Sequence, residues 1–223
     1  MNFKLCKLHN LEKGKRCFIL ANGPSINSHN LSLLKNEIVI SINASPILEN
    51  KFNFKSKYYC LSDPRFLEVQ HKKEIFLKKM DDDTTIFCRE NFYDVLTDNN
   101  IDPSKIIFLN SRGRDGFSKN LHKGFFFGSS TTHMALQLAY WLGCKEVYIL
   151  GLDLIYPSNS KSYRFYKEDI TQAYDYLVSI QLHNYIEAIT IFNTENKHIY
   201  ICNKKSWALP YIEYKNYEET FNV

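Results

Sequence analysis

Four short polar motifs in the sequence follow apolar runs and carry side chains that can bind a nucleotide. They are Asn22-Gly23-Pro24-Ser25, Asn43, Asp63 and Asp153, the last preceded by Gly151. Glycine lets backbone approach a ligand closely, and short amide, hydroxyl and carboxylate side chains supply hydrogen bonds. The first motif is neither a P-loop, since no Gly-Lys-Ser/Thr follows, nor G-x-G-x-x-G. A plain β-turn with a helix cap is the alternative interpretation, because all four residues favour turns.

Hydroxyl side chains also stand at the start of the clearest helical pattern in the chain. Gly128-Ser129-Ser130-Thr131 precedes apolar residues at helical spacing, and the pattern ends at Gly143. Ser and Thr are good N-cap residues, and the free N–H groups of a helix N-terminus attract anions. The motif therefore predicts an anion-binding helix start, with a purely structural cap as the alternative.

The apolar runs that end in these polar residues predict the strands of a parallel sheet. Strands are expected at 16–21, 37–42, 57–62, 84–88, 105–109, 145–150 and 198–202. Helices are expected near 30–34, 65–79, 91–99, 128–143, 168–191 and 216–221, after a polar lead-in over 1–14.

This order predicts the α/β class, as a single Rossmann-like domain over residues 1–223 with a mostly parallel sheet and a small lid at about 154–168. Ligands of such sheets bind beyond the carboxyl ends of the strands, so the polar strand ends predict a nucleotide or nucleotide-sugar site.

Residues 111–124 are polar, basic and glycine-rich, which predicts a loop. The loop is either plain surface or a flexible segment near an anionic ligand, with Arg112 and Arg114 as candidate contacts. The acidic run Asp81-Asp82-Asp83 precedes a predicted strand and is interpreted as a solvated loop.

Composition excludes several classes of protein. The 223 residues carry a formal net charge of +4, far from the strongly basic signature of nucleic-acid-binding domains. Six scattered cysteines form no C-x-x-C pair, and no H-E-x-x-H occurs, so no zinc or redox site and no metal ligand set is predicted. No apolar run approaches 18 residues and the first residues contain no signal-peptide core. We expect a reduced, cytoplasmic protein.

Taken together, the motifs resemble a known superfamily. Asn22 to Ser25, Ser62-Asp63-Pro64, Ser130-Thr131 and Lys145 to Asp153 look like bacterial CMP-sialic-acid-dependent sialyltransferases of lipooligosaccharide loci, which are glycosyltransferase family 42-like. They look at least as much like the MptE-like group (DUF115), some members of which are named for 6-hydroxymethylpterin diphosphokinase. The resemblance spans roughly residues 16 to 203 and does not choose between these members.

The resemblance implies roles for individual residues. In the sialyltransferases the Asn-Gly-Pro-Ser turn and the helix start hold the cytidine nucleotide, and two tyrosines bind the departing phosphate. Here Tyr163 lies in a similar block, whereas Tyr156 is one residue out of register. The family's base is a histidine, for which His183 is the nearest match, about one turn late, and His133 is the rival. A structural histidine is the alternative for each.

The leading hypothesis is an inverting, metal-independent glycosyltransferase. It would move a sialic-acid-like sugar from a CMP-activated donor, without another cofactor, to a glycan or lipid-linked glycan of the bacterial surface. Its place would be cytoplasmic, at the inner face of the membrane, and peripheral membrane contact and homo-oligomers are compatible with the sequence. One alternative is a diphosphokinase that uses ATP and Mg²⁺ with Asp63, Asp153 and Asp115 as carboxylates. Another is a non-catalytic nucleotide-binding protein of polysaccharide assembly.

Overall fold

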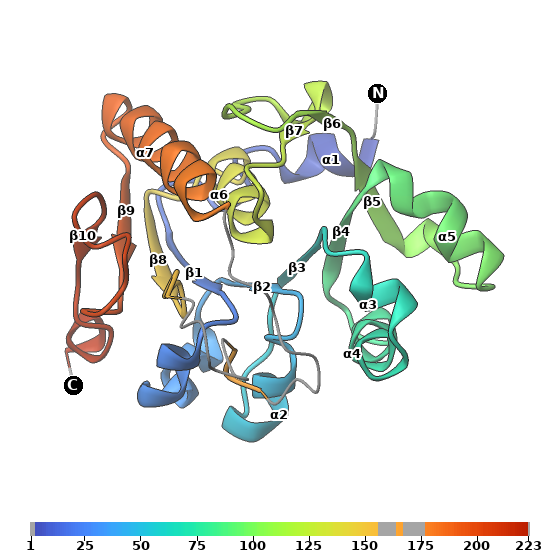
Figure 1. The fold of residues 1–223 in the computed structure, drawn as a ribbon, viewed down its shortest axis with the longest axis horizontal. Coiled ribbons are helices and arrows are strands. Elements are labelled where there is room, and N and C mark those ends of the chain that lie inside the picture. Colours follow the sequence, from blue (N-terminus) through green and yellow to red (C-terminus); the bar gives the residue numbers. More distant parts are fainter. Residues whose placement is uncertain (1–2, 156–163, 167–176, 223) are drawn as a thin grey trace.

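The computed structural model describes residues 3–155, 164–166 and 177–222. Eight parallel strands form one sheet in the order β10-β9-β8-β1-β2-β3-β4-β5 (Figure 1). The strands are β1 Arg16–Leu20, β2 Val39–Ile42, β3 Tyr58–Leu61, β4 Thr85–Arg89, β5 Ile106–Leu109, β8 Glu146–Leu150, β9 His198–Ile201 and β10 Glu213–Tyr214. The predicted α/β class with a parallel sheet is confirmed, and the short β10 was not predicted.

The strand order reverses direction beside β1. The chain runs from β1 outward through β2 to β5, then returns to the other side of β1 with β8. Leu20 in β1 is paired with Ser41 of β2 on one side and Leu150 of β8 on the other. The carboxyl ends of β1 and β8 therefore flank the topological switch point, where ligands of open α/β sheets bind.

Helices cover both faces of the sheet, as Figure 1 shows. One face packs against α1 Phe3–Leu8, α6 Thr131–Trp141 and α7 Val178–Thr194. The other carries η1 Pro24–Ser28, η2 Leu31–Asn36, α2 Ile47–Phe52, α3 Arg65–Glu68, α4 Gln70–Met80, η3 Glu90–Phe92, α5 Tyr93–Asp98 and η6 Glu218–Phe221. Side chains of a strand alternate between faces, so Cys17 and Ile19 join the first core while Phe18 and Leu20 join the second.

The segment 111–124 is more ordered than its composition predicts. It contains β6 Ser111–Gly113 and η5 Leu121–Lys123, and β6 pairs in parallel with β7 Phe125–Phe126. Gln137 of α6 is fully buried, and its Oε1 accepts the backbone N–H groups of Ser118 at 3.0 Å and Phe126 at 2.9 Å. The Gln137 side chain, rather than water, is the hydrogen-bond partner of these two backbone N–H groups. Composition alone does not reveal such a partner.

Other local expectations are corrected as well. The predicted lead-in over 1–14 contains α1 and the fully buried Glu12, whose carboxylate binds Lys15 at 2.9 Å, Lys57 at 2.5 Å and the Tyr58 hydroxyl at 2.8 Å. The helices expected near 30–34 and 216–221 are 3₁₀ turns, η2 and η6. The helix expected over 65–79 is two, α3 and α4, because Val69 between them is extended. Another 3₁₀ turn, η4, spans Pro103–Lys105. Over the described ranges, no helix has the length and apolar character needed to cross a bilayer.

Candidate functional site

A cavity of about 270 Å³ lies at the carboxyl edge of the sheet, around the switch point between β1 and β8. Residues that follow β1, β2, β3 and β8 line it, together with the start of α6 and one side chain of α7. The polar residues among them are Asn22, Asn43, Ser62, Asp63, Arg65, Ser129, Ser130, Thr131, Thr132, Asp153, Arg164 and Gln181. The sequence motifs thus converge on one hollow, which their positions along the chain predicted.

The Asn-Gly-Pro-Ser turn forms one wall by packing directly on the loop after β8. A Cβ atom on Gly23 would lie 2.5 Å from the Gly151 carbonyl oxygen and 2.6 Å from Cγ of Asp153. Only glycine fits this approach. Asp153 accepts the Ser25 backbone N–H at Oδ2 (2.9 Å), the Ser25 hydroxyl at Oδ1, and Nδ2 of Asn203 at Oδ1 (2.7 Å). Asp153 therefore ties the turn after β1 to the ends of β8 and β9.

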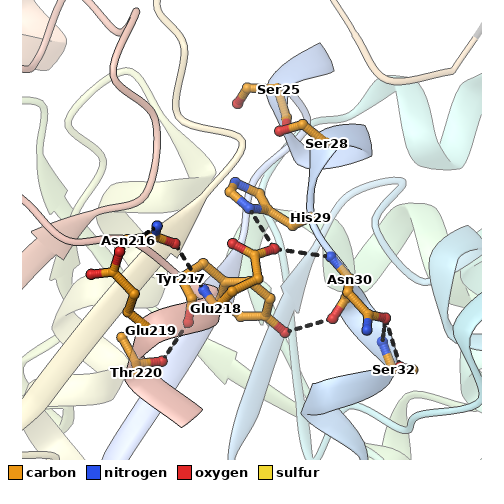
Figure 2. Close-up of polar contacts among 10 residues, drawn as sticks. All are labelled: Ser25, Ser28, His29, Asn30, Ser32, Asn216, Tyr217, Glu218, Glu219 and Thr220. Atoms are coloured by element: carbon orange, nitrogen blue, oxygen red, sulfur yellow. Dashed lines mark hydrogen bonds and ion pairs between the residues drawn. The ribbon is translucent and has the colours of Figure 1, made fainter. Parts of the chain in front are cut away.

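The C-terminal segment contacts the chain just after this turn, at His29 and Asn30 (Figure 2). Glu218 Oε1 accepts the Asn30 N–H at 3.2 Å and lies 3.4 Å from His29 Nδ1, while the Tyr217 hydroxyl donates to the Asn30 carbonyl at 3.2 Å. Ser28 in turn donates its hydroxyl to the Ser25 carbonyl at 2.7 Å. These contacts fix the residues that follow η1 and the last turn of η1 itself.

Asn22, in the described part of this wall, has a buried side-chain oxygen that no donor satisfies. It is 5% exposed and lines the cavity, and its Oδ1 finds no hydrogen-bond donor among the residues that the structure describes. A buried acceptor without a donor is costly, and native proteins rarely keep one. An amine or hydroxyl group of a ligand in the cavity would satisfy it.

The opposite wall is a chain of hydroxyl and amide groups at the start of α6. The Thr131 hydroxyl donates to Asn43 Oδ1 at 3.2 Å and lies 2.6 Å from the Ser62 hydroxyl. Because a hydroxyl has one hydrogen, Ser62 must donate to Thr131. Ser130 is the N-cap, as predicted, accepting the Thr132 N–H at 3.2 Å. These bonds orient polar groups around the N-terminus of an eleven-residue helix, where the partial positive charge favours an anion.

The charged residues of the cavity lining are two arginines, Arg65 and Arg164, and two aspartates, Asp63 and Asp153. Asp63 accepts from the Arg65 guanidinium at both oxygens, from Nε at 2.9 Å to Oδ1 and 3.1 Å to Oδ2, and from Nη2 at 2.6 Å to Oδ2. Burial raises the pKa of Asp63, but the bonds from Arg65 and the charge of Arg164 outweigh it and leave the pKa below its ordinary value. Asp63 is therefore ionised at neutral pH, and its charge is balanced within the wall.

The two candidate histidines lie elsewhere. His183 is exposed on α7, and the cavity lining contains Gln181 instead, two residues earlier and about 200° around the helix. His133 is fully buried in α6, donates Nε2–H to the Gly116 carbonyl at 2.8 Å and does not line the cavity. Burial lowers the pKa of His133 to about 4, so it is neutral at pH 7. The placement favours a structural role for His133.

Most residues predicted to hold the nucleotide line the cavity, although their role stays a prediction: Asn22, Gly23, Asn43, Asp63, Ser129, Ser130, Thr131, Gly151 and Asp153. Pro24, Ser25 and Gly128 do not line it. Tyr156 and Tyr163, with most of the expected lid at 154–168, lie outside the described residues.

The two arginines named as candidate contacts for an anion, Arg112 and Arg114, do not line the cavity, which agrees with the alternative of a plain surface loop. Arg114 pairs with Asp115 at 2.7 Å, and Arg112 lies exposed over the ring of Phe126. Sequence reasoning instead missed Ser62, Arg65, Arg164 and Gln181 as site residues. Ser62 and Arg65 flank Asp63, so the rule that selected Asp63 also applied to them, whereas nothing in the sequence marks Gln181 among other helical residues. Within the described parts of the chain, no group of three or more His, Cys, Asp or Glu side chains is placed to hold a metal ion.

Comparison with known families adds to this geometry. Residues 1–159 match the family described as 6-hydroxymethylpterin diphosphokinase MptE-like. The chain belongs to this MptE-like family. No curated protein matches it.

Solved structures share the fold of this MptE-like chain at low sequence identity. The sialyltransferase CstII from Campylobacter jejuni, in complex with cytidine-5'-monophosphate, is 16% identical with a TM-score of 0.55, over 91% of this chain and 85% of that one. Its complex with CMP-3FNeuAc gives 16% and 0.53, over 90% and 86%. The MAf glycosyltransferase from Magnetospirillum magneticum AMB-1 is 12% identical with a TM-score of 0.57, over 92% of this chain and 34% of that one. The chain thus has a fold found in glycosyltransferases and spans about a third of MAf.

Proposed function

We propose that this MptE-like protein is a glycosyltransferase that takes a sialic-acid-like sugar from a CMP-activated donor and delivers it to a glycan acceptor. The observation that carries the proposal is the cavity at the switch point, where amide and hydroxyl groups converge around the start of α6. The shared fold of CstII, whose structures contain CMP and a CMP-sugar analogue, supports the choice of nucleotide.

In this proposal the residues of the cavity bind different parts of the donor. Asn22, Asn43 and Thr131 bind the cytidine and ribose through hydrogen bonds, and the N–H groups at the start of α6 face the phosphate. Tyr156 and Tyr163 keep the role that the resemblance implies, as donors to the leaving phosphate. A tyrosine has an unperturbed pKa of about 10, so it still donates at pH 7. One such donor to a developing anion contributes roughly 3 to 4 kcal/mol.

The second candidate function is the diphosphokinase activity in the family's description, which requires ATP and Mg²⁺. Magnesium needs carboxylates at the phosphates. Both oxygens of Asp63 already accept from Arg65, and Asp153 accepts three hydrogen bonds from Ser25 and Asn203. A Mg²⁺ ion at either carboxylate would compete with these groups, which is why we place glycosyl transfer first.

Thermal shifts with CMP, UDP, GDP and ATP, each with and without Mg²⁺, test the two candidates. A ligand at 100 times its dissociation constant stabilises by about 2.7 kcal/mol, which raises the melting temperature by roughly 5 to 10 °C at this size. We expect CMP to give this shift regardless of Mg²⁺, and CMP-N-acetylneuraminic acid to be hydrolysed slowly. A shift with ATP and Mg²⁺ alone would refute glycosyl transfer. Binding of CMP with the donor intact after long incubation with acceptors would favour the non-catalytic alternative.

A further inference from the structure

Arg89, the last residue of β4, is a half-buried arginine whose charge has no counterpart in the described chain. Its Nε is buried without a hydrogen-bond partner among the described residues, and it joins none of their ion pairs. Burial is the cause that lowers the pKa of this guanidinium. By contrast, Arg16 pairs with Glu37, Arg65 with Asp63 and Arg114 with Asp115. Uncompensated charge of this kind is costly to the fold and indicates a binding site.

The strand register places Arg89 beside the cavity. Leu61 of β3 is paired with Cys88 of β4, so Arg89 lies level with Ser62 on the neighbouring strand. Cys60 and Phe87 belong to the core on the α6 face, whereas Leu61 and Cys88 belong to the opposite core. Because side chains alternate along a strand, Ser62 and Arg89 both point to the α6 face. Ser62 lines the cavity there, whereas Arg89 is not itself a lining residue but lies next to two that are, Ser62 and Phe127.

Two phenylalanines flank the guanidinium. Its Cζ lies 4.7 Å from the ring centroid of Phe127 and 5.8 Å from that of Phe92. Phe127 lines the cavity and stands four residues before Thr131, where α6 begins. Aromatic rings interact with the faces of a guanidinium, but its N–H groups point outward in the plane and need acceptors.

We propose that Arg89 is a binding residue for an anionic group, a carboxylate or a phosphate, of a substrate that occupies the β4 side of the cavity beyond the nucleotide. A planar guanidinium binds such groups with two parallel hydrogen bonds, and the nearby N-terminus of α6 strengthens the attraction. That the anion belongs to a substrate rests on the proposed function, in which either the sugar of the donor or the acceptor carries it. The anion-binding site itself does not depend on which nucleotide binds.

Titration of inorganic phosphate into protein saturated with CMP measures this site directly. Arg89→Gln should weaken phosphate binding at least tenfold, and Arg89→Lys should weaken it less, because the charge stays and the two-pronged geometry is lost. Arg112→Gln is the matched control: Arg112 also lies over a phenylalanine ring, 5.1 Å from the centroid of Phe126, but Arg112 is exposed, and Phe126, unlike Phe127 beside Arg89, does not line the cavity. Phosphate binding that is equal in wild type and Arg89→Gln overturns the proposal.

The source of the anion follows from two further titrations. A tenfold loss of affinity for CMP-N-acetylneuraminic acid in Arg89→Gln, with CMP affinity unchanged, assigns the site to the carboxylate of the donor. The same loss for sialyllactose but not for lactose, in CMP-saturated protein, assigns it to an anionic acceptor. If neither anionic probe distinguishes Arg89→Gln from wild type, the substrate role is refuted.

Stability separates a binding role from a structural one. Since Arg89 lacks a partner, Arg89→Gln should leave the melting temperature unchanged or raise it by about 2 to 4 °C. A fall of that size would make Arg89 a structural residue and would overturn the proposal. If wild-type protein binds phosphate through Arg89 but does not bind CMP, the proposed function fails while the anion site stands.

Discussion

Asp153 and Asp63 follow strands on opposite sides of β1, and the cavity lies between them. Asp153 accepts uncharged donors from Ser25 and Asn203, which join the ends of three strands. Asp63 accepts a charged donor, Arg65, that is two residues away in its own loop. The first carboxylate therefore holds the backbone together, while the second fixes a local charge. Although both aspartates follow a strand in the sequence, we therefore expect their replacement to have different consequences.

The largest effect is expected on the Asp153 side, from Gly23→Ala. The new Cβ would lie 2.5 Å from the Gly151 carbonyl and 2.6 Å from Cγ of Asp153, so the wall must move apart. We expect a loss of about 3 kcal/mol of unfolding free energy, the upper range for overpacking, measured by urea denaturation. Gly113→Ala is the control, because its nearest neighbour would be a ring carbon at 3.9 Å, and it should change stability by less than about 0.5 kcal/mol. Equal effects of the two would refute the close packing.

The buried His133 of α6 gives the next effect, as a dependence of stability on pH. The pKa of His133 is lowered by burial from 6.5 to about 4, so the unfolded chain binds its proton first as pH falls. Its contribution is complete above about pH 6.5 and is lost between there and pH 4, by about 3 kcal/mol at most. NMR titration of the ring should show a midpoint near 4. A midpoint above 6 would reopen a catalytic role for His133.

Replacing each aspartate by asparagine tests the comparison itself. In Asp153→Asn, one oxygen becomes an NH₂ group, and a buried donor of Ser25 or Asn203 loses its acceptor, at a cost of about 1 to 3 kcal/mol. In Asp63→Asn, the pair lost includes the partly exposed Arg65, so we expect no more than about 1 kcal/mol. Because the pKa of Asp63 is lowered, its share of stability is lost only as pH falls below about 4. Equal losses at pH 7 would show that both carboxylates are structural.

Asn22→Leu, in the turn that packs on Asp153, tests whether Asn22 contributes to CMP affinity or to the stability of the fold. The Oδ1 atom has no donor among the described residues, so an apolar side chain of similar size should leave unfolding free energy unchanged or raise it slightly. Loss of the bond to a ligand should weaken CMP binding about tenfold, which corresponds to 1.4 kcal/mol. Calorimetry of CMP binding and thermal melting of the same variant give both values. Lower stability with unchanged affinity would assign Asn22 to the fold.

The sequence predicted features that depend on neighbouring residues and missed those that depend on residues far apart in the chain. Apolar runs ending in Asn22, Asn43 and Asp153 predicted strands and their common edge, because burial and the parallel sheet are encoded locally. The bonds of Ser25 to Asp153 and of Gln137 to Phe126 join residues distant in the chain or depend on burial, so no local pattern shows them. The unpaired charge of Arg89 became visible only once its neighbours were known.

The smallest effect is expected from the histidine that the resemblance selected. His183 lies two residues after Gln181, and only Gln181 lines the cavity, where its Nε2 donates to the Ser129 carbonyl at 3.0 Å. One helical turn preserves a face, but two residues turn the side chain to the other side. We therefore expect His183→Ala to keep turnover within about twofold, and Gln181→Ala to lower it about tenfold through the altered start of α6. A loss of about 10² or more in His183→Ala, with CMP affinity unchanged, would restore His183 as the base. It would also require α7 to move, because His183 does not line the described cavity.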